Sequence, residues 1–312
     1  MGLKIDDEIV KSAMTEVLMQ NIAAYTESTR GAIQMSSHYI TGDAEDFSQL
    51  GEIASLVGRR DIAVDTDAIV KTLSSIDDNS IICYFTTGSI EFKKVDARRY
   101  GSDVGAFSAA IGEQIGVGFV NYMLNRAIIA GTAAITSETG LVTGDGSAAV
   151  TYSLLNDGLA KFGDASNSIV CWVMAGVTYH EIMGDGIANA MVDSVAGGII
   201  NSGTTNTLGR PAFVTDAAGL AMTTGVAVLG LTTGAFKMAE TATREIFSET
   251  VGGKENLVTR VQGESDVLIG IKGYSYTGAA NPTDAVLGDA ANWSQVATDI
   301  KSTAGVIVNV VK

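Results

Sequence analysis

The 312-residue sequence contains only two cysteines, two histidines and two prolines, and each scarcity removes a class of explanation. Cys83 and Cys171 lie far apart in the apolar runs SIICYF and SIVCWVM, without a CxxC spacing. This arrangement predicts two small buried side chains rather than a disulfide or a metal site. So few prolines leave no proline-rich linker, and no segment has the composition of a disordered one. The chain is long enough for a large core in one or two domains.

Basic residues are also scarce: 20 lysines and arginines stand against 35 acidic residues, which gives a net charge of −15. A dedicated nucleic-acid-binding protein needs a basic face, so this class is disfavoured. The N-terminal MGLKIDDEIVKS has no apolar core and is not a secretion signal. The uncharged stretch 217–236 is long enough to span a membrane, but its glycines and threonines favour loop and strand. We therefore expect a soluble protein made in a cytoplasm.

The motifs of common catalytic and cofactor sites are missing. His180-Glu181 begins a zinc-protease pattern, but Gly184 stands where the second histidine is required. Neither the G-x-S-x-G elbow of serine hydrolases nor a G-x-x-x-x-G-K-[ST] phosphate loop occurs. Carboxylate pairs such as Asp65 and Asp67 are expected on solvated faces. We predict no catalytic, cofactor-binding or metal-binding residue, and an α/β enzyme becomes the weaker hypothesis.

Residues 103–135 are predicted to form one long helix. Ser102 and Asp103 offer N-cap oxygens. The apolar side chains recur every three or four residues on one face: Val104, Phe107, Ile111, Ile115, Phe119 and Tyr122. About thirty helical residues would span about 50 Å. The helix also contains four glycines, each of which costs roughly 1 kcal/mol in helix propensity: Gly105, Gly112, Gly116 and Gly118. Another backbone is therefore expected to pack closely against it.

Several shorter elements are also predicted from local patterns. Residues 3–27 have the spacing of an amphipathic helix, with these apolar positions: Ile9, Ala13, Val17 and Ile22, with Met14 and Leu18 alongside. Thr86–Ser89 separates two apolar runs and predicts a hairpin. Residues 177–187 are predicted to form a short helix closed by Gly184 and Gly186. A further helix is expected over 151–164, and strands over 168–175 and 211–217.

Four stretches, taken in order, are similar to parts of the tailed-phage major capsid proteins of the Hong Kong 97 type. SIVCWVMAGVTYHEIM (168–183) resembles the strand and short helix of that family's axial domain, and TLGRPAFVTDAAG (207–219) resembles its G-x-P strand. VLGLTTGAFKMAE (228–240) resembles the return strand, and residues 269–308 are similar to the C-terminal part of one capsid branch. The resemblance covers nearly the whole chain.

The resemblance implies an α+β fold of the Hong Kong 97 type. Its parts would be an N-terminal arm (1–40), an extended loop (41–67), a peripheral domain (68–145) with spine helix 103–135, an axial domain (146–235), and a return to the peripheral domain with C-terminal strands (236–312). The arm and the loop would lie on neighbouring subunits and gain stability only by association. The predicted inter-subunit contacts are Phe47, Leu50, Ile53, Leu56, Arg59 and Arg60.

The implied function is that of the major head protein of a tailed bacteriophage. It would assemble into hexamers and pentamers of an icosahedral shell around double-stranded DNA, without specific DNA binding, cofactor or membrane. Further partners would be a portal protein and a separate scaffolding protein, with a decoration protein as a further candidate. Because the arm begins almost at Met1, either that scaffold is separate or a leading segment is removed. Assembly would occur in the host bacterial cytoplasm, and the product would be the virion head. The alternative is an encapsulin-like nanocompartment shell protein.

Overall fold

The computed structural model describes residues 6–37, 44–50, 62–63, 75–93, 95, 99, 104–192, 208–240, 244–253, 255–256 and 258–312. The helices are α1 (Asp7–Ser28), α3 (Val104–Thr136), α4 (Tyr152–Ala160), α5 (Gly176–Val192) and α6 (Asp284–Leu287). The strands are β1 (Ile33–Ser37), β2 (Ala44–Leu50), β3 (Ser75–Thr86), β4 (Ile90–Lys93), β5 (Val142–Thr143), β6 (Ile169–Met174), β7 (Ala212–Val214), β8 (Val226–Thr232), β9 (Phe236–Glu240), β10 (Glu245–Val251), β11 (Val258–Ile271), β12 (Tyr274–Tyr276), β13 (Trp293–Gln295) and β14 (Gly305–Val310).

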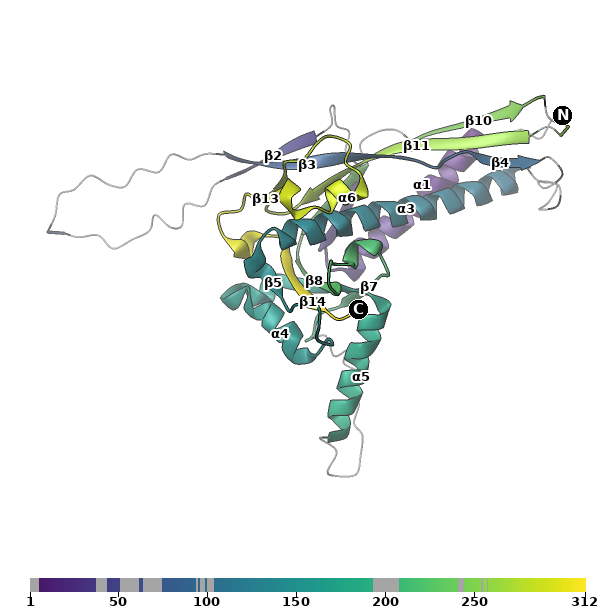
Figure 1. Ribbon diagram of the computed structural model, residues 1–312. Coiled ribbons are helices and arrows are strands. Elements are labelled where there is room, and N and C mark those ends of the chain that lie inside the picture. Colours follow the sequence, from purple (N-terminus) through teal and green to yellow (C-terminus); the bar gives the residue numbers. More distant parts are fainter. Residues whose placement is uncertain are drawn as a thin grey trace.

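Two sheets organise these strands. The larger one is built around β11, which pairs with β3, β4, β9, β10 and β12. The smaller one has the order β5-β14-β8-β6-β7. In Figure 1 the larger sheet runs across the top of the molecule with α3 beneath it, and the smaller sheet lies below α3. Helix α5 projects downward from the smaller sheet, away from the rest of the body. Buried side chains from both sheets form one continuous core.

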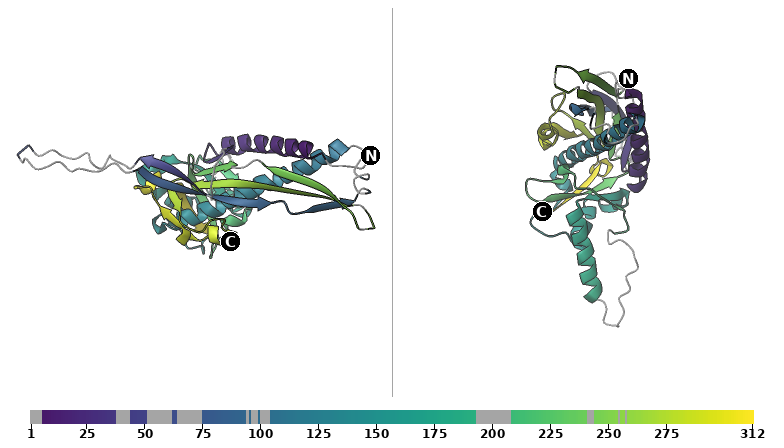
Figure 2. Two further views of the ribbon diagram at one scale, coloured as in Figure 1. Left: turned by 90° about the horizontal axis from the view of Figure 1, so that it is seen from above. Right: turned by 90° about the vertical axis from the view of Figure 1, so that its right-hand side faces the viewer.

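Helix α3 confirms the predicted long helix, and α1 explains two of its glycines. A Cβ atom at Gly112 would lie 2.4 Å from the carbonyl oxygen of Val10, and one at Gly116 would lie 3.3 Å from that of Met14. The backbone nitrogen of Asp6 donates to Ser108 Oγ at 3.3 Å. The contacting residue numbers rise together along the two helices, so α1 and α3 run parallel with their backbones in close contact. Figure 2 shows α1 along the side of the molecule away from the C-terminus.

Helix α1 is therefore part of the core of its own subunit. Its buried face consists of Val10, Met14 and Leu18, spaced four residues apart along one seam. The expectation that the arm gains stability only by association is wrong for these residues. Met14 and Leu18, predicted to lie alongside the apolar face, are buried. Ile9, Ala13 and Val17 lie on one side of the seam and are only half-buried.

The predicted hairpin at Thr86–Ser89 is wrong. β3 and β4 both pair antiparallel with β11, Thr86 opposite Glu264 and Ile90 opposite Val261. Three residues thus face two on β11, which is a β-bulge within one continuous edge. Gly88 adopts a φ of 68° there. Thr87 closes the bulge, since its backbone nitrogen donates to the Gly263 oxygen at 2.9 Å and its hydroxyl accepts from the Gly263 nitrogen at 2.8 Å.

Helix α5 is longer than predicted. It continues to Val192, and Gly184 lies inside it with open space around its Cα, so the glycines do not end the helix. The two cysteines, in contrast, are buried and not bonded to each other, as predicted.

The smaller sheet combines strands that are distant in sequence. β14 lies between β5 and β8, and all six of its residues are buried. It pairs antiparallel with β8, Gly305 opposite Leu231 and Val310 opposite Val226. The sheet therefore draws on residues before 146 and after 236 as well as on the segment between them.

Candidate assembly surfaces

Two of the six predicted contact residues lie at one end of the larger sheet. Phe47 and Leu50 lie in β2, where they are paired with Asp78 and Ser75 of β3. Figure 1 shows this β2–β3 ladder leaving the body on the left. The other four predicted residues lie outside the described part of the chain: Ile53, Leu56, Arg59 and Arg60. The prediction that these six side chains contact a neighbouring subunit remains a prediction.

The opposite end of the same sheet is a three-stranded ribbon of β10, β11 and β4. One face of it carries a charged row across the three strands, because Glu249 faces Arg260 and Arg260 faces Glu91. Arg260 Nε lies 2.5 Å from Glu91 Oε1, with both side chains more than a third exposed. Next to this row, Phe247 is 66% exposed beside a hollow of about 440 Å³. A large exposed aromatic side chain beside a hollow is a candidate anchor for a partner surface.

Phe247 was missed by the sequence reasoning although a signal was present. Ile246 and Phe247 are adjacent, and neighbouring strand residues point to opposite faces of a sheet. Since Ile246 is buried, Phe247 must point to the outer face.

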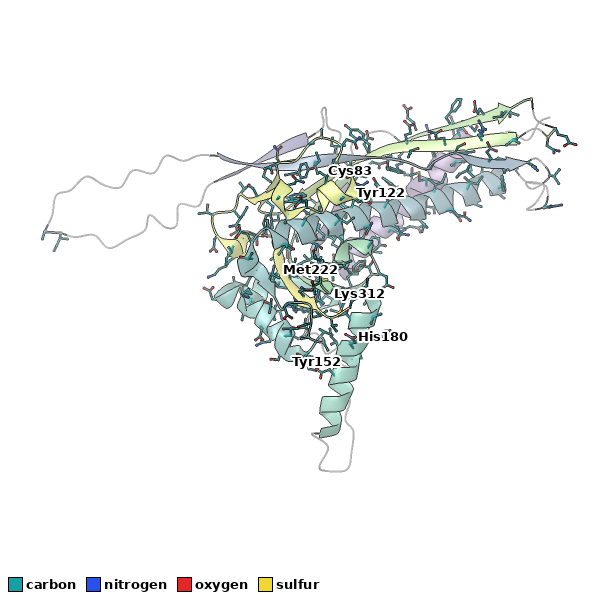
Figure 3. The ribbon with its side chains drawn as sticks, viewed as in Figure 1. Cys83, Tyr122, Tyr152, His180, Met222 and Lys312 are labelled. Carbon is teal, nitrogen blue, oxygen red and sulfur yellow. The ribbon has the colours of Figure 1, made fainter. Side chains whose placement is uncertain are left out.

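An aromatic groove lies between α3 and the β3–β4 bulge. The rings of Phe85 and Phe119 stack at 4.4 Å, and Phe85 meets Tyr122 at 5.4 Å. The groove has a volume of about 370 Å³, and Gly118 leaves its floor open. Tyr122 donates to the Tyr84 carbonyl oxygen at 3.2 Å, and burial raises the pKa of its hydroxyl. Figure 3 shows Tyr122 and Cys83 on adjoining parts of α3 and the sheet.

Arg126 fixes the segment around α6 against α3. Its guanidinium lies 2.7 Å from Asp284 Oδ1 and donates to the Pro282 oxygen at 3.1 Å. The same group lies 4.9 Å from the centroid of the Tyr122 ring, within range of a cation–π contact. Arg126 therefore links the Tyr122 side of the aromatic groove to the segment around α6.

The geometry of the described residues offers little for catalysis. His180 is exposed on α5 and packs edge-on against Tyr179 at a centroid distance of 5.7 Å. Within the described ranges, no group of three or more His, Cys, Asp or Glu side chains is arranged to hold a metal ion. Burial raises the pKa of both Cys83 and Cys171 to about 11, which disfavours the reactive thiolate.

Comparison with known proteins identifies the family of this chain. Residues 2–307 match the model of the family "Gp13-like: Major capsid protein 13-like". The chain belongs to this family. It is a major capsid protein of the tailed-phage type, and the encapsulin alternative is not favoured. A search among curated protein sequences finds no match to it.

Solved phage structures share the Hong Kong 97-type fold of this capsid protein. A chain from Microbacterium phage Oxtober96 aligns with a TM-score of 0.52 at 11% identity, covering 90% of each chain. A chain from Mycobacterium phage Adephagia aligns at 0.50 and 9% identity, covering 91% of this chain and 89% of that one. A chain of the satellite phage P4 procapsid that includes the size determination (Sid) protein aligns at 0.51 and 11% identity, covering 96% and 91%.

Phage capsid proteins form the virion head. Across the described residues of this capsid protein, no helix has the length and apolar character needed to cross a membrane.

Proposed function

We propose that this capsid protein assembles into hexamers and pentamers of an icosahedral shell that encloses double-stranded DNA. The observation that carries the proposal is the family match over residues 2–307. The shape supports it, because the larger sheet extends beyond the body at both ends and presents exposed strands to neighbours (Figure 1). The subunit has a structural role in this proposal and catalyses no reaction.

In this proposal each part of the fold has its own role in assembly. The larger sheet with α3 serves as the peripheral domain, and the smaller sheet with α4 and α5 serves as the axial domain, whose tips meet at capsomer centres. Strand pairing supports the assignment of β5 and β14 to the axial domain as well, although both strands lie outside residues 146–235. The segment 41–67 serves as the extended loop that reaches over the next subunit.

The remaining partners follow from this role. A portal protein would occupy one vertex, and a separate scaffolding protein would guide assembly in the host bacterial cytoplasm. A decoration protein is a further candidate. The satellite phage P4 procapsid, which includes a size determination protein, supports the idea that accessory proteins bind shells of this fold.

A loop replacement tests the role of the extended segment. Leu50 and Ser75 face each other across the β2–β3 ladder, so a short glycine-serine turn can join them in place of residues 51–74. The ladder from Ala44 opposite Ile81 to Leu50 opposite Ser75 is retained. We expect the variant to melt cooperatively like the parent and to form no shells by negative-stain microscopy.

The outcomes separate the alternatives. A variant that still forms normal shells contradicts the assembly role of the loop, and one that does not fold places the loop in the subunit core. If the parent protein forms only monomers or dimers even with its scaffold, the shell function itself is wrong. Shells that enclose a cargo protein instead of DNA would indicate a nanocompartment.

A further inference from the structure

The outer face of the ribbon of β4, β10 and β11 has an exposed aromatic side chain at its centre. Phe247 is 66% exposed and lies in β10 directly opposite Gln262 of β11. The hollow of about 440 Å³ beside the ring leaves room for a side chain of a partner. Six residues line it: Ser89, Glu91, Phe247, Glu249, Arg260 and Gln262. We call these six residues, together with Glu245 and Glu264, the ribbon face.

The surround of Phe247 is acidic, and strand register shows how the acids are placed. Glu245 lies directly opposite Glu264, in the next row of the same face after the pair of Phe247 and Gln262. Both glutamates are exposed, and like charges directly opposite each other in a sheet repel. Two further glutamates line the hollow, so four carboxylates stand against the guanidinium of Arg260. The ribbon face therefore has a net charge of −3, and a partner that covers it has to bring positive charge.

The same chain contains a segment with the opposite character. Residues 93–99, KKVDARR, hold four of the 20 basic residues and one aspartate, which gives them a net charge of +3 in a chain of −15. The structure describes Lys93, Val95 and Arg99 of this segment, and all three are exposed. Val95 is 49% exposed, so the segment presents an apolar side chain flanked in sequence by cations. It is thus the counterpart of Phe247 in its acidic surround.

The direction of β4 favours docking between copies over docking within one chain. Lys93 is the last residue of β4 and lies opposite Val258, whereas Phe247 lies opposite Gln262. Four residues along β11 separate the two rows, a distance of about 13 Å. β4 therefore carries the chain away from its own hollow as the segment begins. Because the ribbon face and the start of the segment lie at the same end of the molecule, copies that meet at this end present both surfaces to each other (Figure 1).

We propose that residues 93–99 of a second copy of this chain dock on the ribbon face, with Val95 beside Phe247 and the cations among the glutamates. The proposal rests on the proposed function, in which copies of the chain assemble into a shell. A lysine or arginine over the exposed ring of Phe247 adds a cation–π contact. Charge complementarity of this kind fixes the register of two surfaces and speeds their encounter, and it weakens as salt is added.

The first test reverses the charges on the two sides in separate full-length variants. The face variant carries Glu249→Lys and Glu264→Lys, and the segment variant carries Lys93→Glu and Lys94→Glu. Each variant alone brings like charges together, so its yield of shells should fall at least about tenfold below the parent. In an equal mixture, the reversed segment of one variant meets the reversed face of the other, and the unchanged surfaces match as before. The mixture should therefore recover the yield to within about twofold of the parent. Pairing within one chain gives no recovery on mixing.

The second test is a cross-link between copies, which reports the contact without charge reversal. Chains with Val95→Cys are mixed with chains with Gln262→Cys, allowed to assemble and then oxidised mildly. Both native cysteines are buried. The control replaces Val95→Cys by Val117→Cys, a valine of α3 that is 50% exposed. A disulfide needs Cα atoms within about 7 Å, so the Val95→Cys mixture should give at least about tenfold more of the mixed disulfide than the control mixture.

Equal cross-linking of the two mixtures, or folded charge variants whose mixture does not recover, would overturn the proposal. If the face variant loses binding of the scaffolding protein and the cross-link is absent, the ribbon face takes an accessory protein and the proposal is likewise wrong. Microscopy of the parent in the same experiments separates the two levels of failure. Absent parent shells contradict the proposed function, whereas normal parent shells without the cross-link contradict only this contact.

Discussion

The contact between α1 and α3 gives the sharpest test of the fold. In Gly112→Ala the new Cβ atom would lie 2.4 Å from the Val10 carbonyl oxygen and 3.0 Å from the Ala13 Cβ. The nearer distance is about 1 Å shorter than an ordinary van der Waals contact, and the atom it meets is backbone. Helix α1 therefore has to move away from α3, and with it the buried Val10 and Met14.

Two effects of opposite sign determine how Gly112→Ala changes the free energy of unfolding. Alanine in place of glycine favours the helix by about 1 kcal/mol, whereas overpacking of this kind costs about 1–3 kcal/mol. Gly118→Ala is the matched control, because it lies in the same helix and nothing lies within 4 Å of its new Cβ. The control should therefore be stabilised by up to about 1 kcal/mol. The difference between the two variants reports the overpacking alone, about 1–3 kcal/mol.

The measurement is urea denaturation of the unassembled subunit together with hydrogen exchange of the α1 amides. We expect Gly112→Ala to unfold at lower urea than Gly118→Ala and to exchange faster over residues 10–18. Equal stability and equal exchange in the two variants would refute the reasoning, because α1 would then not be packed on its own subunit. A difference that appears only in assembled particles would instead place α1 on a neighbour.

Further predictions concern single side chains. Arg244→Ala removes a half-buried ion pair and a hydrogen bond to Thr15 of α1, so the free energy of unfolding in urea should fall by about 1–3 kcal/mol. The control Arg260→Ala removes an exposed pair and should lower it by less than about 1 kcal/mol. Equal losses in the two variants would contradict this prediction. The thiol pKa values, about 11 in the fold against 9.0 ordinarily, mean that the unfolded state releases protons first, so the free energy of unfolding should fall as pH rises from 9 to 11. A double Cys83→Ala, Cys171→Ala variant should lose part of this dependence, and an unchanged profile would count against it. His180→Ala should change stability by less than about 0.5 kcal/mol; any hydrolytic activity abolished by it would show a catalytic role.

Elements with a sustained local pattern could be predicted from the sequence. The long helix was found to within a residue at each end because its apolar face repeats over many turns. The strand β6 was found because IVCWVM is apolar throughout, as expected of a buried strand. In both cases the information lies within the segment itself.

The errors arose where a remote partner decides the structure. The Thr86–Ser89 signal is the same for a hairpin and for a bulge, and the deciding partner, β11, begins at Val258. Gly184 resembles a helix stop, yet a stop requires a left-handed conformation after the last turn, and Gly184 instead lies within α5. The exposed position of Phe247 likewise depends on which strands pair. Of the predicted contact residues, Phe47 and Leu50 are placed on β2 by its pairing with β3.

The pairing of β14 has a consequence for when the subunit can assemble. The strand lies in the interior of the smaller sheet, between β5 and β8, and its residues are all buried. Without residues 305–310, the edges of β5 and β8 would be left as unpaired backbone within the core, which is energetically unfavourable. The sheet that bears α5 is therefore complete only after residue 310 has been synthesised. The larger sheet has the same property, because its central strand β11 begins at Val258. A nascent chain that ends before these residues therefore cannot complete either sheet.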